Sequence, residues 1–318
     1  MLRFIQSRIF MQTLAVLAVL SWAVYMLVSS STFVQVAYPS CFWKGIASIQ
    51  SHYVAMCLVL AAGFLIQLLL SDVYYFRGGF GDTHHLMVIF WLLLLSCCGG
   101  FIHEMSPVWL SNIVLVMIIS LNFDYDRGNL KNKDLFSGIL TGIGFLFYPP
   151  ILFIAFFVIS SLVINRFSKY KDIIVYILGI LLVFLYTFCY YLFTDRLPEL
   201  YKMLTELKFY VSFLVTGVFS WKEIVLVSAA AVSLLYAVVI LKIQYGNKQV
   251  LLRKRLMTIH LITITTLLMM VFSPYDIHRS MGFVIIPMTL YYAMLSQMKE
   301  HPIVNDFMML IFAVSLCL

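Results

Sequence analysis

The sequence predicts an all-α protein, a polytopic bundle of about eleven helices that cross a lipid bilayer, with the N-terminus inside and the C-terminus outside. Two observations predict this fold. Apolar residues make up 63% of the 318 residues and charged residues only 11%, whereas soluble domains carry about a quarter charged residues. Several runs also remain apolar over the roughly 20 residues that a spanning helix needs.

Two other fold classes do not fit these apolar runs. A soluble protein of this composition would expose large apolar patches and aggregate. A membrane β-barrel would alternate apolar and polar residues along strands of about ten residues, while these runs are continuously apolar. Helices satisfy their backbone hydrogen bonds internally, as hydrocarbon requires.

The first predicted span lies at about 9–31 and follows Arg3 and Arg8 in the sequence. A cationic start before an apolar run also occurs in signal peptides, but no clean small-residue cleavage site follows. We therefore expect a retained helix. The other spans are predicted at about 53–73, 86–102, 107–122, 135–148, 149–165, 172–193, 222–241, 257–273, 282–297 and 304–318.

Two of these spans are short and meet at Pro149-Pro150. Proline has no amide hydrogen to continue a helix, and it disfavours the helical conformation in the residue before it. The segment 135–165 is therefore predicted to be a tight helical hairpin or one sharply broken helix.

Lysine and arginine set the predicted orientation, because cytoplasmic loops carry an excess of them. With the N-terminus inside, the inner segments hold 15 of the 21 cations and the outer segments hold 6. The net charge of +7 therefore reflects membrane topology, and we expect no nucleic-acid partner. The inner cluster Arg253–Arg255 is predicted to contact anionic lipid. His260, inside the following span, is expected to be a satisfied polar contact.

An amphipathic segment is predicted at about 198–220, on the outer side. Leu200, Met203 and Leu204 recur at helical spacing, with charged Glu199 and Lys202 on the other side. Such a helix lies at the membrane interface. It serves either as a lid over a substrate or as a flat connector. The chain otherwise shows no domain boundary, so 1–318 is expected to form a single domain.

The most suggestive polar group lies in the outer turn between the ninth and tenth spans. It combines Tyr275, Asp276, His278 and Arg279 in the stretch Ser273–Ser280. Arginine binds phosphate oxygens bidentately, and a carboxylate or an imidazole can act as a general base. These types suit a lipid-linked phosphate substrate. In the alternative, Asp276 caps the next helix and pairs with Arg279.

A second candidate carboxylate is Glu104, in the short outer turn before the fourth span. It is either an outward-facing acid or base, or part of a solvated turn. Arg196 follows the seventh span at the same outer level and either binds substrate phosphate or starts the amphipathic helix. The six cysteines form no CxxC pair and His103-Glu104 lacks metal-ligand spacing, so no metal or cofactor is expected.

Three stretches carry a resemblance to a known family. They are Phe145–Pro150, Asn165–Asp172 running into a span with Gly179, and Ser273–Ser280 leading to Phe283 and Ile286-Pro287. Together they resemble an uncharacterised family of polytopic inner-membrane proteins of Bacteroidota. This resemblance implies a multi-pass protein of the bacterial inner membrane, and it brings no established activity.

The layout is also similar to that of the C-type glycosyltransferases, which take sugars from polyprenyl-phosphate donors on the outer face. That resemblance implies a polyprenyl-phosphate-linked sugar as substrate and an acidic residue in the first outer loop. Here the loop Ser31–His52 contains neither Asp nor Glu. The catalytic carboxylate is then expected from Glu104 or Asp276.

The leading hypothesis is a membrane protein of envelope biogenesis that acts on a lipid-linked glycan at the outer face. Asp276 would be the acid or base, with Arg279 and His278 on the phosphate. A transporter or flippase for a lipid-linked or small substrate is the second hypothesis, which the scarcity of charge within the spans disfavours for an ion-coupled pump. A non-catalytic scaffold of a secretion or motility complex is the third. Membrane lipid is an expected partner in all three.

Overall fold

In the computed structural model, the described residues are almost entirely helical, which confirms the all-α class. The only strands among the described residues are β1 (Val34–Gln35) and β2 (Glu104–Met105), two residues each. They pair in parallel, with Val34 opposite Glu104. The structure describes residues 24, 34–35, 52–74, 90–92, 94–95, 104–123, 132–165, 170–206, 221–246, 250–273, 277–296, 307, 310–311 and 314.

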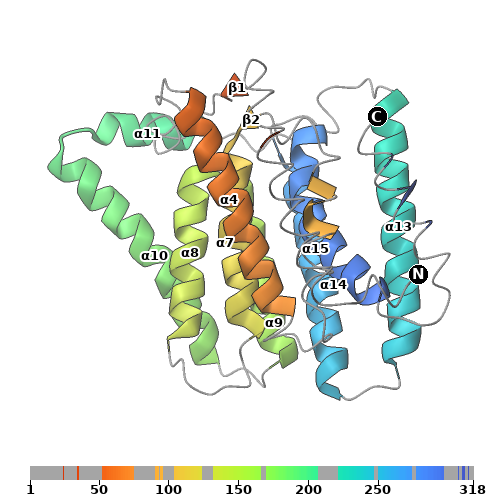
Figure 1. Ribbon diagram of the computed structural model, residues 1–318. Helices are drawn as coiled ribbons and strands as arrows, with labels where there is room; N and C mark the ends of the chain where they lie inside the picture. The colour runs from red at the N-terminus through yellow and green to blue at the C-terminus, as the bar shows by residue number, and fades with distance from the viewer. Residues whose placement is uncertain are drawn as a thin grey trace.

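The long helices stand side by side, and one short helix, α11, lies across one end of the bundle (Figure 1). We call this end the α11 end and the other the opposite end. The elements are α4 (His52–Asp72), α7 (Pro107–Phe123), α8 (Lys133–Phe147), the 3-10 helix η4 (Pro149–Phe153), α9 (Ile154–Asn165), α10 (Tyr170–Phe193), α11 (Leu197–Glu206), α13 (Trp221–Tyr245), α14 (Val250–Val271) and α15 (Ile277–Ser296).

Three described helices are long and apolar enough to cross a membrane. They contain the stretches Tyr170–Phe193, Ile224–Gln244 and Leu252–Val271, and four shorter apolar helices accompany them. This is compatible with a membrane protein. The predicted spans at 9–31, 86–102 and 304–318 lie largely outside the described residues, so the count of eleven stays a prediction.

Two helices extend beyond the predicted spans. α14 begins at Val250, before the span predicted at about 257–273, and α15 begins at Ile277, before the span predicted at about 282–297. Apolar runs mark where a helix enters hydrocarbon, but a helix continues through charged residues that remain hydrated. Arg253–Arg255 therefore lie in the first turns of α14, and His278 and Arg279 in the first turn of α15, instead of in loops.

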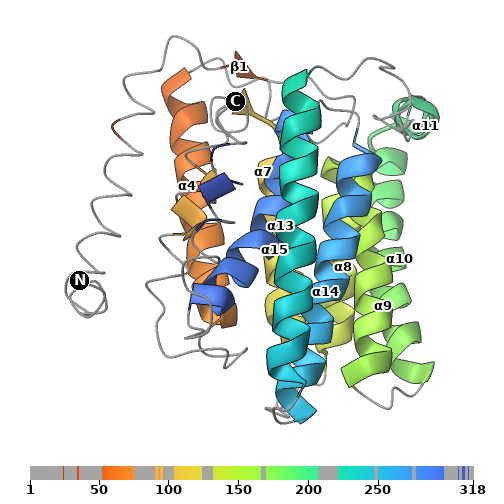
Figure 2. The ribbon, with the colours of Figure 1, turned by 90° about the vertical axis from the view of Figure 1, so that its right-hand side faces the viewer.

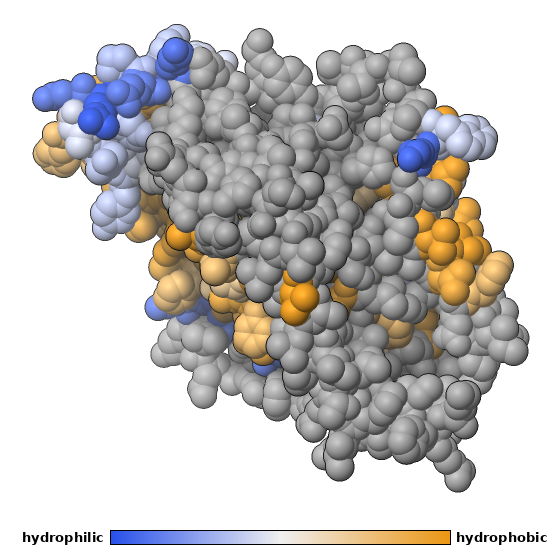
Figure 3. Space-filling view, turned by 45° about the horizontal axis from the view of Figure 1, so that its top comes forward, coloured by the Kyte–Doolittle hydropathy of each residue, from blue (hydrophilic) through white to orange (hydrophobic). Residues whose placement is uncertain are grey.

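The flank of the bundle is apolar where the structure describes it. Along α10, Leu181 is 55% exposed and Leu185 61% exposed. Hydrophilic residues gather at the α11 end, whereas the described flank below is hydrophobic (Figure 3). An apolar face of this kind suits contact with lipid tails, since water would favour its aggregation.

The core is built around α15. Every side chain from Ser280 to Leu295 is buried, and α15 packs against α7, α13 and α14. Figure 2 shows α15 enclosed among these helices. Because it is apolar on all sides, α15 can occupy the centre of the bundle.

α8 and α10 pack through glycines. A methyl group on Gly138 would collide with the carbonyl oxygen of Tyr176, and one on Gly179 would lie 2.5 Å from the carbonyl oxygen of Leu135. Small residues of this kind let two helix backbones approach closely in a membrane. The side chains of Thr141 and Tyr176 bond across the same contact at 3.0 Å.

The chain reverses direction at the two prolines. The Tyr148 amide donates to the carbonyl oxygen of Gly144 and closes α8, and Pro149 then begins η4. α9 returns toward the opposite end, packed mainly against α14 (Figures 1 and 2). Of the two predicted arrangements, the structure therefore has the helical hairpin.

α10 ends in a left-handed cap at Asp195, where φ is +54°. The Asp195 amide donates to the Leu192 carbonyl oxygen, and the Arg196 amide donates to the Tyr191 carbonyl oxygen at 2.9 Å. This is a Schellman motif, which satisfies carbonyls at the end of a helix. The cap turns the chain from α10 into α11.

Candidate functional site

The predicted site residues fall into two groups in the structure. Tyr275 and Asp276 lie outside the described residues, as does His103. The backbones of His278 and Arg279 are described, in the first turn of α15, but their side chains are not. The roles predicted for these four side chains therefore stay predictions.

Glu104 and Arg196 lie at the α11 end, in backbone positions that were not predicted. Glu104 belongs to β2 and pairs with Val34 of β1, so this turn is joined to the preceding outer loop. Arg196 is exposed, and its carbonyl oxygen accepts the amide of Glu199 as α11 begins. The backbone of Arg196 thus starts the short helix α11, which is one of the two roles predicted for it; its predicted role in phosphate binding stays a prediction.

A cluster of buried hydroxyl groups lies directly beside the segment 274–276. Tyr148 donates its hydroxyl hydrogen to Ser273 Oγ at 2.7 Å, and Ser280 donates to the same oxygen at 2.7 Å. All three side chains are buried. We call Tyr148, Ser273 and Ser280 the hydroxyl cluster. It ties both ends of the segment 273–280 to the turn after α8.

Aromatic rings surround the hydroxyl cluster and support it. The Tyr148 ring stacks on Phe283 of α15 at a centroid distance of 5.5 Å, and Phe153 stacks on Phe272 at 4.8 Å. Stacked rings pack with defined geometry. Two stretches that carry the family resemblance, 145–150 and 273–280, are thus in direct contact.

Two buried polar side chains lie on α7 and directly before it. Asn112 is fully buried, and its Nδ2 donates to the Gly282 carbonyl oxygen at 3.0 Å, in the second turn of α15. Within the part of the chain that the structure describes, the Asn112 Oδ1 and the Ser106 Oγ have no hydrogen-bond partner. A buried polar atom without a partner costs about 1–3 kcal/mol.

An apolar groove of about 370 Å³ runs between α4 and α7, and we call it the α4–α7 groove. Met105 and Ser106 line it at the α11 end, and Ile113 lies two turns further along α7. Leu58 and Leu65 form its α4 wall. Because its walls are apolar, the α4–α7 groove suits a hydrocarbon chain.

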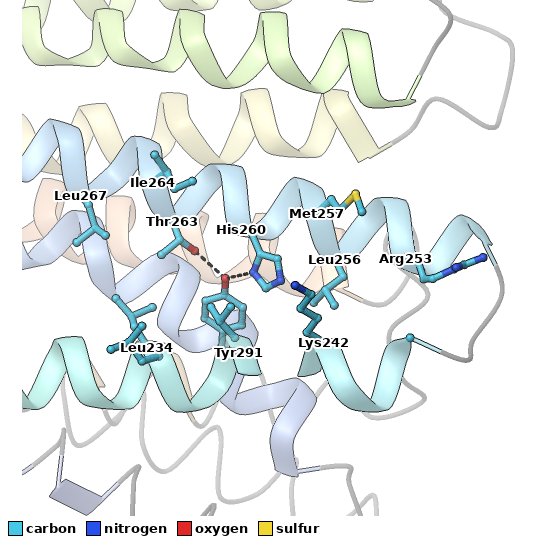
Figure 4. Close-up of a pocket in the computed structure, with 13 residues that line it drawn as sticks. Leu234, Lys242, Arg253, Leu256, Met257, His260, Thr263, Ile264, Leu267 and Tyr291 are labelled. Carbon is cyan, nitrogen blue, oxygen red and sulfur yellow. Dashed lines mark hydrogen bonds between the residues drawn. The ribbon is translucent and has the colours of Figure 1, made fainter. Parts of the chain in front are cut away.

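A larger cavity of about 650 Å³ lies between α13 and α14, and we call it the α13–α14 groove. Its interior holds His260, whose Nδ1 lies 2.6 Å from the Tyr291 hydroxyl oxygen. His260 is therefore a satisfied polar contact, as expected. Lys242 and Arg253 line the groove at the opposite end of the bundle (Figure 4).

Little in the sequence signals these features. Ser273 and Ser280 only bound a charged stretch, and Tyr148 precedes two prolines. Their contact joins positions 125 residues apart, which no local pattern reveals. Ser106 and Asn112 carry no distinguishing spacing.

Neither a metal-binding cluster among the described residues nor a known relative indicates what these groups do. Among the described residues, no group of three or more His, Cys, Asp or Glu side chains is placed to hold a metal ion. The chain matches no protein-family model, no curated protein and no solved structure.

Proposed function

We propose that this chain is a multi-pass protein of the bacterial inner membrane that transfers a sugar from a polyprenyl-phosphate donor at the outer face. The observation that carries the proposal is the hydroxyl cluster, which anchors both ends of the segment that contains Asp276, His278 and Arg279. Transfer depends on positioning, and a reacting group performs best on a backbone held by packing and hydrogen bonds.

In the proposed reaction, an acceptor hydroxyl attacks the anomeric carbon of the donor sugar. The bond from that carbon to the phosphate oxygen breaks, and polyprenyl phosphate leaves with the bonding electrons. Asp276 accepts the proton of the acceptor hydroxyl as general base. Arg279, with Tyr275 and His278 beside it, binds the phosphate and offsets its growing negative charge. Glu104 is the alternative carboxylate, and Arg196 is a further phosphate-binding candidate.

The α4–α7 groove supports a lipid-linked donor. Such a donor needs a place for its phosphate at the interface and a path for its hydrocarbon chain within the membrane. The groove begins at Met105, the neighbour of Glu104, and continues along α7. Asn112 of α7 bonds to the second turn of α15. α7, which forms one wall of the groove, is therefore connected to the helix in which the 273–280 segment ends.

The distribution of charge supports the α11 end as the outer face. Among the cations whose backbone is described, Arg196, Lys202, Lys222 and Arg279 lie at or next to the α11 end. Lys133, Lys171, Lys242, Arg253, Lys254 and Arg255 lie near the opposite end. Cytoplasmic ends carry the excess of Lys and Arg, so the opposite end is proposed to be cytoplasmic.

The test is sugar transfer by full-length protein in proteoliposomes supplied with a polyprenyl-phosphate-linked hexose. Asp276→Asn is expected to lower the rate about 100-fold or more, since general acid–base groups contribute about 10²–10⁴-fold. Arg279→Ala is expected to raise the donor concentration needed for half-maximal rate. Lys222→Ala, an exposed residue in the first turn of α13, is the matched control and should transfer normally.

Two other outcomes would replace the proposal. Donor that moves between leaflets without transfer, in wild type and in Asp276→Asn alike, indicates a flippase. No transfer or movement in wild type, with partner proteins that co-purify with both variants, indicates a scaffold.

A further inference from the structure

The α13–α14 groove is open toward the flank of the bundle and apolar over most of its length. Leu234 and Val238 of α13 and Ile264 of α14 line its inner part. Leu235 and Met257 also line it and are more than half exposed. A hydrocarbon chain can therefore enter from the side, in contact with Met257 and Ile264 along about two turns of α14.

One end of this groove is cationic. Lys242 lies in the last turn of α13 and Arg253 in the first turn of α14, and both side chains are exposed. Figure 4 shows the two at the same end of the groove. Basic pockets between membrane helices on the cytoplasmic side bind anionic lipid headgroups. The charge here is complementary to a phosphate.

The polar side chains His260, Thr263 and Tyr291 line the groove between its cationic end and its apolar part. The Thr263 Oγ1 lies 3.0 Å from the Tyr291 hydroxyl oxygen and 2.9 Å from the Ile259 carbonyl oxygen, and the Tyr291 hydroxyl lies 2.6 Å from His260 Nδ1. In the tautomer in which Tyr291 donates to Nδ1, the remaining imidazole hydrogen is on Nε2, because a neutral ring carries only one. Figure 4 places this far nitrogen on the Lys242 side of the ring. The groove thus offers a hydrogen-bond donor one step inside its cationic end.

We infer that the α13–α14 groove binds an anionic glycerophospholipid. Its phosphate contacts Lys242 and Arg253, an ester carbonyl accepts the hydrogen of His260 Nε2, and an acyl chain lies along Val238 and Ile264. A polyprenyl phosphate fits less well, because it has no polar group beyond its phosphate. Its chain would leave the half-buried imidazole donor without a partner within the membrane, which is costly.

The headgroup contact is tested by native mass spectrometry of the full-length protein with phosphatidylglycerol and with phosphatidylcholine of the same acyl chains. Wild type is expected to prefer phosphatidylglycerol. Lys242→Gln and Arg253→Gln are each expected to weaken its binding about fivefold. Lys171→Gln, an exposed cation on α10 at the same end of the bundle, is the control. An equal loss in the control, or no preference in wild type, overturns the inference.

The ester contact is tested with ether-linked phosphatidylglycerol, which lacks the carbonyl groups. Wild type is expected to bind the ester lipid more tightly than the ether lipid, and His260→Phe to bind both equally. A merely structural role of His260 would weaken both lipids alike and leave their ratio unchanged, which contradicts the proposed contact. Tighter binding of undecaprenyl phosphate than of phosphatidylglycerol would also overturn the inference and assign this groove to the donor of the proposed reaction.

Discussion

Tyr148 and Ser273 are joined by a hydrogen bond of 2.7 Å, although 125 residues separate them in the sequence. The bond connects the turn after α8 to the segment between α14 and α15. Both side chains are fully buried, so water does not compete for either hydroxyl. The contact holds Ser273, the first residue of the segment that is proposed to act through Asp276 and Arg279.

Removal of the Tyr148 hydroxyl tests this contact. Tyr148→Phe keeps the ring that stacks on Phe283 but removes the donor to Ser273. We expect a loss of about 0.5–1.5 kcal/mol in the free energy of unfolding, together with slower sugar transfer. Tyr201→Phe, at a 72% exposed residue of α11, should change neither. Equal thermal unfolding of wild type and Tyr148→Phe in detergent would contradict the contact.

The close packing of α8 and α10 predicts that alanine substitution destabilises the protein much more at Gly138 than at Gly246. Gly138→Ala places a methyl group against the carbonyl oxygen of Tyr176, which cannot turn away as a side chain can. We expect a destabilisation of about 1–3 kcal/mol, measured by thermal unfolding. At Gly246 the nearest atom to an added methyl is 3.2 Å away, so Gly246→Ala is the control. Similar melting temperatures for the two variants would show that the helices are further apart.

The cap at Asp195 predicts a stabilising substitution. A residue with φ of +54° is strained unless it is glycine, which lacks Cβ. Asp195→Gly is therefore expected to raise the free energy of unfolding by about 0.5–1 kcal/mol, and Asp195→Val to lower it. If both substitutions destabilise the protein equally, the Asp195 carboxylate has a role beyond ending α10.

The α4–α7 groove predicts an effect that depends on the chain length of the donor. Ala62→Trp places a large ring on the groove wall. Transfer from a polyprenyl-phosphate donor should fall, while transfer from a donor with a short isoprenyl chain should persist, because only the long chain needs the groove. Ala231→Trp, at an exposed position of α13, is the control. Equal loss with both donors would place the hydrocarbon chain elsewhere.

The positions of most helices follow from the sequence, whereas their ends and contacts do so only in part. α4 and α10 begin within about two residues of the predicted starts, because their apolar runs are bounded by polar residues. α14 began earlier than predicted, since charged residues continue a helix beyond the hydrocarbon. The hydroxyl cluster and the pairing of Glu104 with Val34 depend on tertiary contacts, and no local pattern encodes them. The close approach at Gly138 likewise depends on which helix lies opposite.

The most direct test of the proposed function is photo-crosslinking with a polyprenyl-phosphate probe added from the outer face, with the labelled residues mapped by mass spectrometry. We expect labelling in the segment 273–280 and along the α4–α7 groove, and we expect Arg279→Ala to abolish it. Labelling confined to the α13–α14 groove, or unchanged labelling in Arg279→Ala, would contradict it.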